Sequence, residues 1–222
     1  MAAGPLALVG GDEFRPGNEE TDRVLVGRGE PAYVLATAAA RQNPGAAVAT
    51  ARAWFAGLGL SVEGLPVLTR ADAQRPDLVE RARAGRFFYL AGGDPGLVVD
   101  VLKDSPVWAA ILDAWRNGAA LAGSSAGSMA LGEFTLLREK WPNHQRRRLA
   151  PALGVVPGVA VIPHHDTAGQ RWTAPPGATL VGIDERTAAL WQDGEWRTTG
   201  PGRVTLLGGG SLPQPLVASV DS

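Results

Sequence analysis

Residues 119–131 read AALAGSSAGSMAL, and this stretch decides the fold class. An apolar run at 119–122 leads into a corner rich in glycine and serine, and good helix formers follow from residue 126. Residues 123–127 fit the G-x-S-x-G pattern, in which a strand turns sharply into a helix and projects a serine. Glycines suit the flanks because larger side chains would crowd the strained turn. The order strand, turn, helix therefore predicts Ser125 as an exposed nucleophile.

Short apolar runs and helical patterns alternate on the N-terminal side of this corner. The predicted strands cover 6–9, 32–38, 62–68 and 86–90, and the predicted helices cover 19–28, 44–58 and 76–84, with two more between Asp94 and Asn117. This rhythm predicts an α/β fold with a mostly parallel sheet and helices on both faces. Functional sites in such sheets collect beyond the carboxyl ends of the strands.

The second half of the chain breaks the rhythm. Residues 138–150 are typical of an exposed loop, and the strand predicted at 159–162 ends at Pro163. From residue 178, four short strands joined by Asp-Glu, Asp-Gly and Pro-Gly turns predict a small antiparallel C-terminal extension. We expect one domain over residues 1–222, as the length suggests.

Composition narrows the function classes. The net charge of −1 does not favour nucleic acid or a membrane surface as a partner. The lack of cysteine excludes disulfides, thiolate metal sites and Cys-His chemistry. The N-terminus lacks a basic segment and a long apolar run, so we expect no export signal and a cytoplasmic protein.

Two of the three histidines supply a candidate general base, which a nucleophilic serine requires. His164 and His165 follow a predicted strand, whereas His144 lies among charged residues. Neighbours on an extended chain point to opposite sides, so we expect only one of the pair to serve. For the same reason, a metal site built from this pair and Asp166 is disfavoured.

Three carboxylates are candidates for orienting the histidine, namely Glu133, Glu139 and Asp166. The residues alone do not choose among them.

The stretch Gly92-Gly93-Asp94-Pro95 follows another predicted strand. Asp94 suits a helix N-cap with Pro95 at the first helical position. The glycines also allow the backbone to approach a ligand. We expect the N–H groups of Gly93 and Ala126 to form an oxyanion hole.

Four segments together resemble the S51 serine peptidases, a family that includes peptidase E (an aspartyl dipeptidase) and the cyanophycinases. They are residues 87–94, 123–127, 163–164 and 182–188. The resemblance implies a glutamine amidotransferase-like fold and a Ser-His-acid triad without a cofactor, and it suggests a homodimer. The Gly-Ile-Asp-Glu stretch at 182–185 favours the cyanophycinase-like branch.

The resemblance also assigns roles within the triad. It makes Ser125 the nucleophile and His164 the base, with His165 in a place usually held by an aromatic residue. The acid of the family lies between serine and histidine, where Glu139 is the nearest carboxylate.

We therefore expect a serine peptidase that hydrolyses short peptides. Substrate-binding candidates are Asp94, His165, Asp184 and Glu185. An acidic substrate would require arginines, for which Arg138, 146–148 and Arg171 are available, whereas a β-aspartyl-arginine substrate would require carboxylates such as Asp184 or Glu185.

Two other functions stay open. One is a binding protein on the same scaffold without a competent triad. The other is an esterase of the α/β-hydrolase type, which is disfavoured because further strands follow His164 and no His-Gly-Gly-Gly stretch is present.

Overall fold

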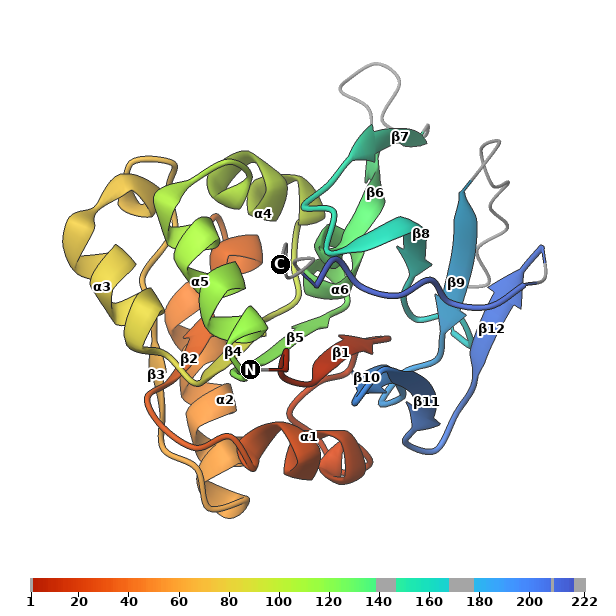
Figure 1. The fold of residues 1–222 in the computed structure, drawn as a ribbon, viewed down its shortest axis with the longest axis horizontal. Coiled ribbons are helices and arrows are strands. Elements are labelled where there is room, and N and C mark those ends of the chain that lie inside the picture. The colour runs from red at the N-terminus through yellow and green to blue at the C-terminus, as the bar shows by residue number, and fades with distance from the viewer. Residues whose placement is uncertain (1, 139–146, 168–177, 209, 218–222) are drawn as a thin grey trace.

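The computed structural model describes residues 2–138, 147–167, 178–208 and 210–217. These residues form two β-sheets together with helices (Figure 1). The larger sheet has seven strands in the order β11-β10-β1-β5-β4-β2-β3, and the smaller sheet has five in the order β12-β9-β8-β6-β7. No helix in this described part of the chain is long and apolar enough to cross a membrane.

The larger sheet has a parallel centre with an antiparallel edge. Strands β1, β5, β4, β2 and β3 run parallel, while β10 pairs antiparallel with β1 and β11 with β10. Apolar runs suit the parallel strands because helices cover both of their faces. The strands are β1 (Leu6–Val9), β2 (Ala32–Leu35), β3 (Val62–Gly64), β4 (Phe87–Leu90), β5 (Ala120–Ser124), β10 (Ala188–Gln192) and β11 (Glu195–Thr199).

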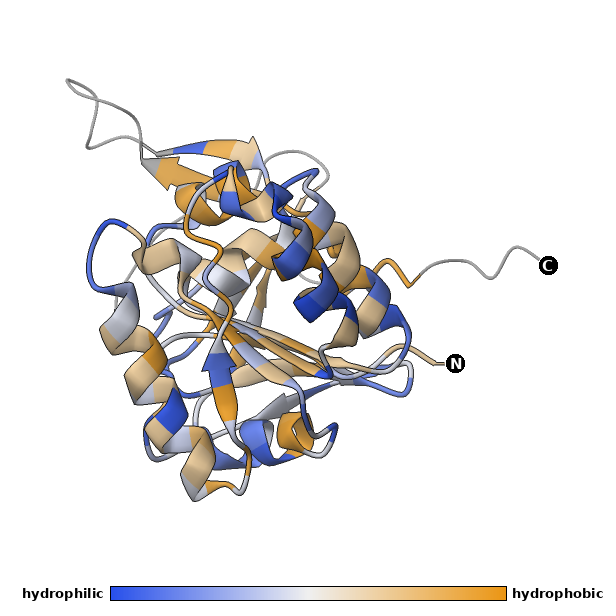
Figure 2. Ribbon diagram, turned by 90° about the vertical axis from the view of Figure 1, so that its left-hand side faces the viewer, coloured by the Kyte–Doolittle hydropathy of each residue, from blue (hydrophilic) through white to orange (hydrophobic). Residues whose placement is uncertain are grey.

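Helices pack on both faces of this sheet, as the sequence predicts (Figure 2). Along β1, Leu6 and Leu8 join the hydrophobic cluster under α3, α4 and α5, whereas Ala7 and Val9 join the cluster under α1 and α2. The helices are α1 (Glu19–Val26), α2 (Pro44–Gly57), α3 (Pro76–Ala84), α4 (Pro95–Leu102), α5 (Pro106–Arg116) and α6 (Ala126–Leu131), with 3-10 turns at Thr37–Ala39 and Asp72–Gln74. Proline opens α2 to α5, which suits a first turn whose N–H groups lack partners.

The smaller sheet corrects two expectations. Its strands are β6 (Gly132–Arg138), β7 (Arg147–Pro151), β8 (Val156–Ile162), β9 (Thr179–Ile183) and β12 (Val204–Leu207). Part of the expected loop at 138–150 therefore forms strand, because β6 and β7 pair antiparallel. The expected antiparallel pairing is confirmed between β9 and β12 and between β10 and β11. These two pairs lie in different sheets, however, and β9 runs parallel to its other neighbour, β8. Turn residues show where a strand begins, but they do not select its neighbour.

The two sheets approach each other at the carboxyl ends of β1, β8 and β9. The N–H of His164, just after β8, donates to the carbonyl of Gly10, just after β1, at 2.7 Å. The N–H of Gly10 donates in turn to the carbonyl of Thr187 at 2.9 Å. These bonds bring the loops that follow strands of both sheets to one place.

A buried carboxyl group joins the two helices on one face of the larger sheet. Asp22 on α1 accepts a hydrogen bond from the indole Nε1 of Trp54 on α2 at 2.7 Å. Burial raises the pKa of Asp22 to about 7, because desolvation disfavours the charged form.

This shift makes stability depend on pH. Between about pH 4 and pH 7 the folded chain holds the Asp22 proton more tightly than the unfolded chain, so the contribution of Asp22 to the free energy of unfolding falls as the pH rises through that window. An Asp22→Asn variant keeps an acceptor for Trp54 but does not ionise. In denaturant titrations, the free energy of unfolding of the variant minus that of wild type should rise by about 2–4 kcal/mol between pH 4 and pH 8. A constant difference would contradict the assignment.

Candidate active site

Ser125 lies on a strained corner between β5 and α6. Its backbone has φ 49° and ψ −112°, a region that side chains other than glycine rarely adopt. Its N–H donates to the carbonyl of Val9 at 3.0 Å, which ties the corner to β1. Both flanking glycines are required by space: a Cβ on Gly123 would lie 2.5 Å from the Gly127 carbonyl carbon, and one on Gly127 would lie 2.2 Å from the Leu90 carbonyl oxygen.

A methyl group at Gly127 should therefore be costly. We expect Gly127→Ala to lower the free energy of unfolding by about 1–3 kcal/mol or more, as overpacking of a fixed backbone does. Gly57→Ala is the matched control: nothing lies within 4 Å of that added Cβ, and the position is helical. It should raise stability by about 0.5–1 kcal/mol. Equal effects of the two variants in denaturant titrations would refute the packing argument.

His164 faces this serine from the end of β8. Its Nε2 lies 3.0 Å from the Ser125 Oγ. The residue has φ 51°, and its imidazole ring lies over Gly11, where a Cβ would come within 2.2 Å of Cε1. Gly11 itself has φ 125°, so glycine is required there both for conformation and for space.

Glu185 follows β9 and completes the line of hydrogen bonds. Its Oε1 lies 2.8 Å from His164 Nδ1 and accepts a further bond from Thr167 Oγ1 at 3.1 Å. Its backbone N–H donates to Asp166 Oδ1 at 3.1 Å. An ionised carboxylate only accepts hydrogen bonds, so Nδ1 carries the proton and Nε2 is left to accept from the Ser125 hydroxyl.

The other candidate acids do not occupy this position. Glu139, which the resemblance favours, lies outside the described residues. Glu133 accepts a bond from the N–H of Gly158 at 2.5 Å, within the smaller sheet. Asp166 supports the backbone of Glu185 rather than the imidazole. Among the described carboxylates, Glu185 is the one bonded to His164.

The expected oxyanion donors flank the serine. Ala126 is the first residue of α6, and Gly93 follows β4 with φ 141°, where a Cβ would lie 2.4 Å from the Ala38 carbonyl oxygen. Within the described residues, neither backbone N–H takes part in a hydrogen bond. Gly92 also lies close, since a Cβ there would be 3.3 Å from Ser125 Cβ.

The remaining expected substrate contacts make internal bonds. Asp94 caps α4 by accepting from the Gly96 N–H at 2.8 Å. His165 packs against Gly182 and lies 3.6 Å from Asp184, measured from Nδ1 to Oδ1. The other oxygen of Asp184 accepts from the N–H of Arg203 at 2.8 Å. A role for these residues in substrate binding stays a prediction.

Among the candidate arginines, Arg146 and Arg171 lie outside the described residues. Arg148 is on β7 and exposed. No group of three His, Cys, Asp or Glu side chains that could hold a metal is found in the described ranges.

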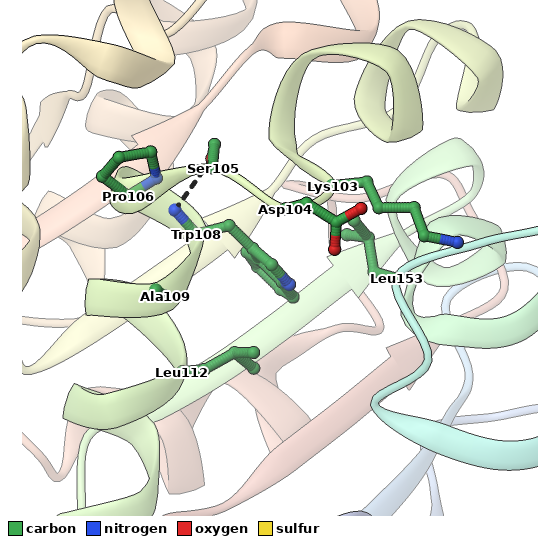
Figure 3. A pocket seen from close by; sticks show the side chains of 8 residues that line it. All are labelled: Lys103, Asp104, Ser105, Pro106, Trp108, Ala109, Leu112 and Leu153. Atoms are coloured by element: carbon green, nitrogen blue, oxygen red, sulfur yellow. Dashed lines mark hydrogen bonds between the residues drawn. The ribbon is translucent and has the colours of Figure 1, made fainter.

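A separate pocket of about 450 Å³ lies at the start of α5 (Figure 3), and Ser125, His164 and Glu185 are not among its lining residues. Its lining is mainly apolar around Trp108. The hydroxyl oxygen of Ser105 caps α5 by accepting a hydrogen bond from the N–H of Trp108 at 3.1 Å. The lining residues are Lys103, Asp104, Ser105, Pro106, Trp108, Ala109, Leu112 and Leu153.

Sequence reasoning missed the contact between Glu185 and His164. The signal was present in the two strands, because parallel strands end at the same sheet edge. β8 and β9 are in register from Val159 opposite Thr179 to Ile162 opposite Gly182, so the residues that follow them are neighbours. Reading the second strand as antiparallel hid this proximity.

Comparisons with known proteins show what the chain as a whole is similar to. The model of peptidase family S51 matches residues 20–199. A cyanophycinase from Synechococcus elongatus is 31% identical over 157 residues, which cover 66% of this chain and 49% of the relative. A cyanophycinase from Nostoc sp. is 28% identical over 216 residues, covering 91% of this chain and 72% of the relative. The chain thus spans about half the length of the Synechococcus relative.

Two solved structures are also similar. A peptidase from an acI-B1 Actinobacterium has a TM-score of 0.82 and 30% identity, with 97% of this chain and 95% of the other covered. A putative peptidase E protein from Listeria monocytogenes has a TM-score of 0.63 at 16% identity, covering 90% of this chain and 100% of the other, a similarity of fold alone.

Proposed function

We propose, from the premise that this chain belongs to peptidase family S51, that it is a serine peptidase acting on short peptides through Ser125, His164 and Glu185. The observation that carries the proposal is the continuous line of hydrogen bonds from the Ser125 Oγ through both nitrogens of His164 to Glu185. Glu185 takes the place that the resemblance gave to Glu139.

Each member of the line has one task in this mechanism. His164 Nε2 takes the proton of Ser125 as its Oγ attacks the scissile carbonyl, and the same nitrogen then delivers that proton to the leaving amine. Glu185 holds the Nδ1–H tautomer and stabilises the imidazolium that forms. Water, activated by His164 in the same way, hydrolyses the acyl-enzyme.

The oxyanion of the tetrahedral intermediate requires donors that are already in place. The N–H groups of Gly93 and Ala126 suit this role because both belong to corners with fixed backbones next to Ser125.

The substrate class is proposed from the relatives. The curated relatives are named cyanophycinases, so a basic residue beside the scissile bond is one arm of the proposal. The second arm of the proposal is a peptide substrate whose first residue is acidic. It is suggested by the similarity of fold to the putative peptidase E protein.

Hydrolysis of a defined peptide panel tests the proposal. The panel contains β-aspartyl-arginine, α-aspartyl dipeptides, neutral dipeptides and tripeptides, with p-nitrophenyl esters alongside. Peptide hydrolysis that depends on Ser125 supports a peptidase, and the preferred residue selects the basic or the acidic arm. Turnover of esters alone would favour the esterase. No turnover, together with no reaction with a serine-directed phosphonate, would favour a binding protein.

A further inference from the structure

Glu13 makes two hydrogen bonds immediately behind the nucleophile, and the proposed mechanism gives it no task. It follows β1, two residues after Gly11. Its Oε1 accepts from the N–H of Gly92 at 2.8 Å, and its Oε2 accepts from the hydroxyl of Ser124 at 2.7 Å.

These two contacts lie on the two loops that carry the proposed oxyanion donors. Gly92 precedes Gly93 after β4, and Ser124 precedes Ser125 and Ala126 at the end of β5. One carboxylate therefore joins the chain on both sides of the position where the oxyanion forms. A Cβ on Gly92 would lie 3.0 Å from Glu13 Oε1 and 3.3 Å from Ser125 Cβ, so the contact is compact.

We infer that Glu13 is a positioning residue that fixes the Gly92-Gly93 peptide relative to the Ser124-Ser125 corner, and so sets the spacing of the oxyanion donors. The inference rests on the proposed serine mechanism. Both oxygens of Glu13 are engaged with the protein, so its part in catalysis is exerted through the backbone of its partners.

The Ser124 end of this bridge is buried. Ser124 is fully buried, and the Tyr89 hydroxyl beside it is buried without a hydrogen bond of good geometry among the described residues. Burial raises the pKa of Tyr89 well above its ordinary value, and the charges of Asp22 and Glu13 act in the same direction. Glu13 and Gly92 are half-buried, and hydrogen bonds to a carboxylate are stronger than those between neutral groups.

Removing the carboxylate should therefore loosen the oxyanion site without emptying it. In Glu13→Ala, the Gly92 N–H and the Ser124 hydroxyl lose their shared acceptor, and the two loops are free to separate. Small misplacements of donors are costly, because preorganised donors act only at the position that the oxyanion occupies.

The test measures the second-order rate constant for labelling of Ser125 by an alkyl fluorophosphonate, a probe that becomes tetrahedral at the serine. We expect Glu13→Ala to slow labelling by about 10- to 100-fold, less than the loss of a donor itself. Glu13→Gln keeps an acceptor for Gly92 and offers an amide N–H to Ser124, so it should recover to within about 3-fold of wild type. With the best peptide of the panel, the loss should appear in kcat rather than in KM.

Glu30→Ala is the matched control, since the Glu30 carboxylate also accepts from a backbone N–H, that of Ser61 at 3.0 Å, but this pair lies just before β2 and β3, at the end of the parallel strands opposite to Ser125. It should label at the wild-type rate. If Glu13→Ala does not fold, Ser124→Ala removes one half of the bridge and should slow labelling several-fold.

The outcomes distinguish a failure of the role inferred for Glu13 from a failure of the proposed serine mechanism. Wild-type labelling rates in both Glu13→Ala and Ser124→Ala would overturn the inference and leave the serine mechanism intact. A Glu13→Gln variant as slow as Glu13→Ala would also overturn it, because the bridge and not the charge is proposed to act. A wild-type protein that neither labels nor hydrolyses any peptide would instead refute the proposed function.

Discussion

Replacing Ser125 with alanine is expected to lower kcat for the best peptide by about 10⁵-fold or more, the loss seen when a triad nucleophile is removed. The physical reason is that, among the residues that the structure describes, the Ser125 hydroxyl is the one bonded to His164 Nε2. The measurement is steady-state hydrolysis at saturating substrate, with the folded state verified by thermal unfolding.

Ser128→Ala is the matched control for this loss. Ser128 lies on α6, the short helix that follows Ser125. Its hydroxyl donates to the backbone carbonyl of Ser125 at 2.8 Å and not to the imidazole of His164. We expect this variant to keep most of its activity. A Ser125→Ala enzyme that still turned over peptides within tenfold of wild type would exclude Ser125 as the nucleophile.

Glu185→Gln is expected to lower kcat by about 10⁴-fold. The amide preserves the shape of the side chain but can present an N–H to His164 Nδ1, which favours the tautomer whose Nε2 is protonated and unable to take the Ser125 proton. The loss should fall mainly on kcat, because Glu185 touches the imidazole and not the peptide in the proposed mechanism.

Glu139→Gln provides the direct comparison between the two candidate acids. Glu185 already occupies Nδ1 of His164, so we expect the Glu139 variant to keep near wild-type kcat. The reverse result, a large loss at Glu139 and a small one at Glu185, would restore the acid that the resemblance selects.

The local features of this site could be predicted from sequence. The Ser125 corner is encoded by adjacent residues, since the glycines that permit it lie two positions to either side. Proline and capping residues likewise mark the starts of α4 and α5, where Asp94 and Ser105 accept from the first turn. The parallel sheet with helices on both faces follows from the rhythm of such elements.

The long-range features could not be predicted in the same way. Whether Glu185 meets His164 depends on β9 lying parallel to β8, and the 16 residues between these strands carry no pattern that selects this pairing. Glu13 was missed for a related reason: its partners, Gly92 after β4 and Ser124 on β5, are 79 and 111 residues away along the chain. In the sequence, Glu13 and its neighbour Asp12 resemble ordinary surface carboxylates until the sheet order is known.

Active-site labelling followed by peptide mapping tests the central claim most directly, because it requires no knowledge of the natural substrate. Wild-type protein, Ser125→Ala and Glu185→Gln are treated with an alkyl fluorophosphonate, and the adducts are located by mass spectrometry. The account predicts one adduct per wild-type chain on Ser125, none on the alanine variant, and much slower labelling of Glu185→Gln. An unlabelled wild-type protein, or an adduct on another residue that persists in Ser125→Ala, would contradict it.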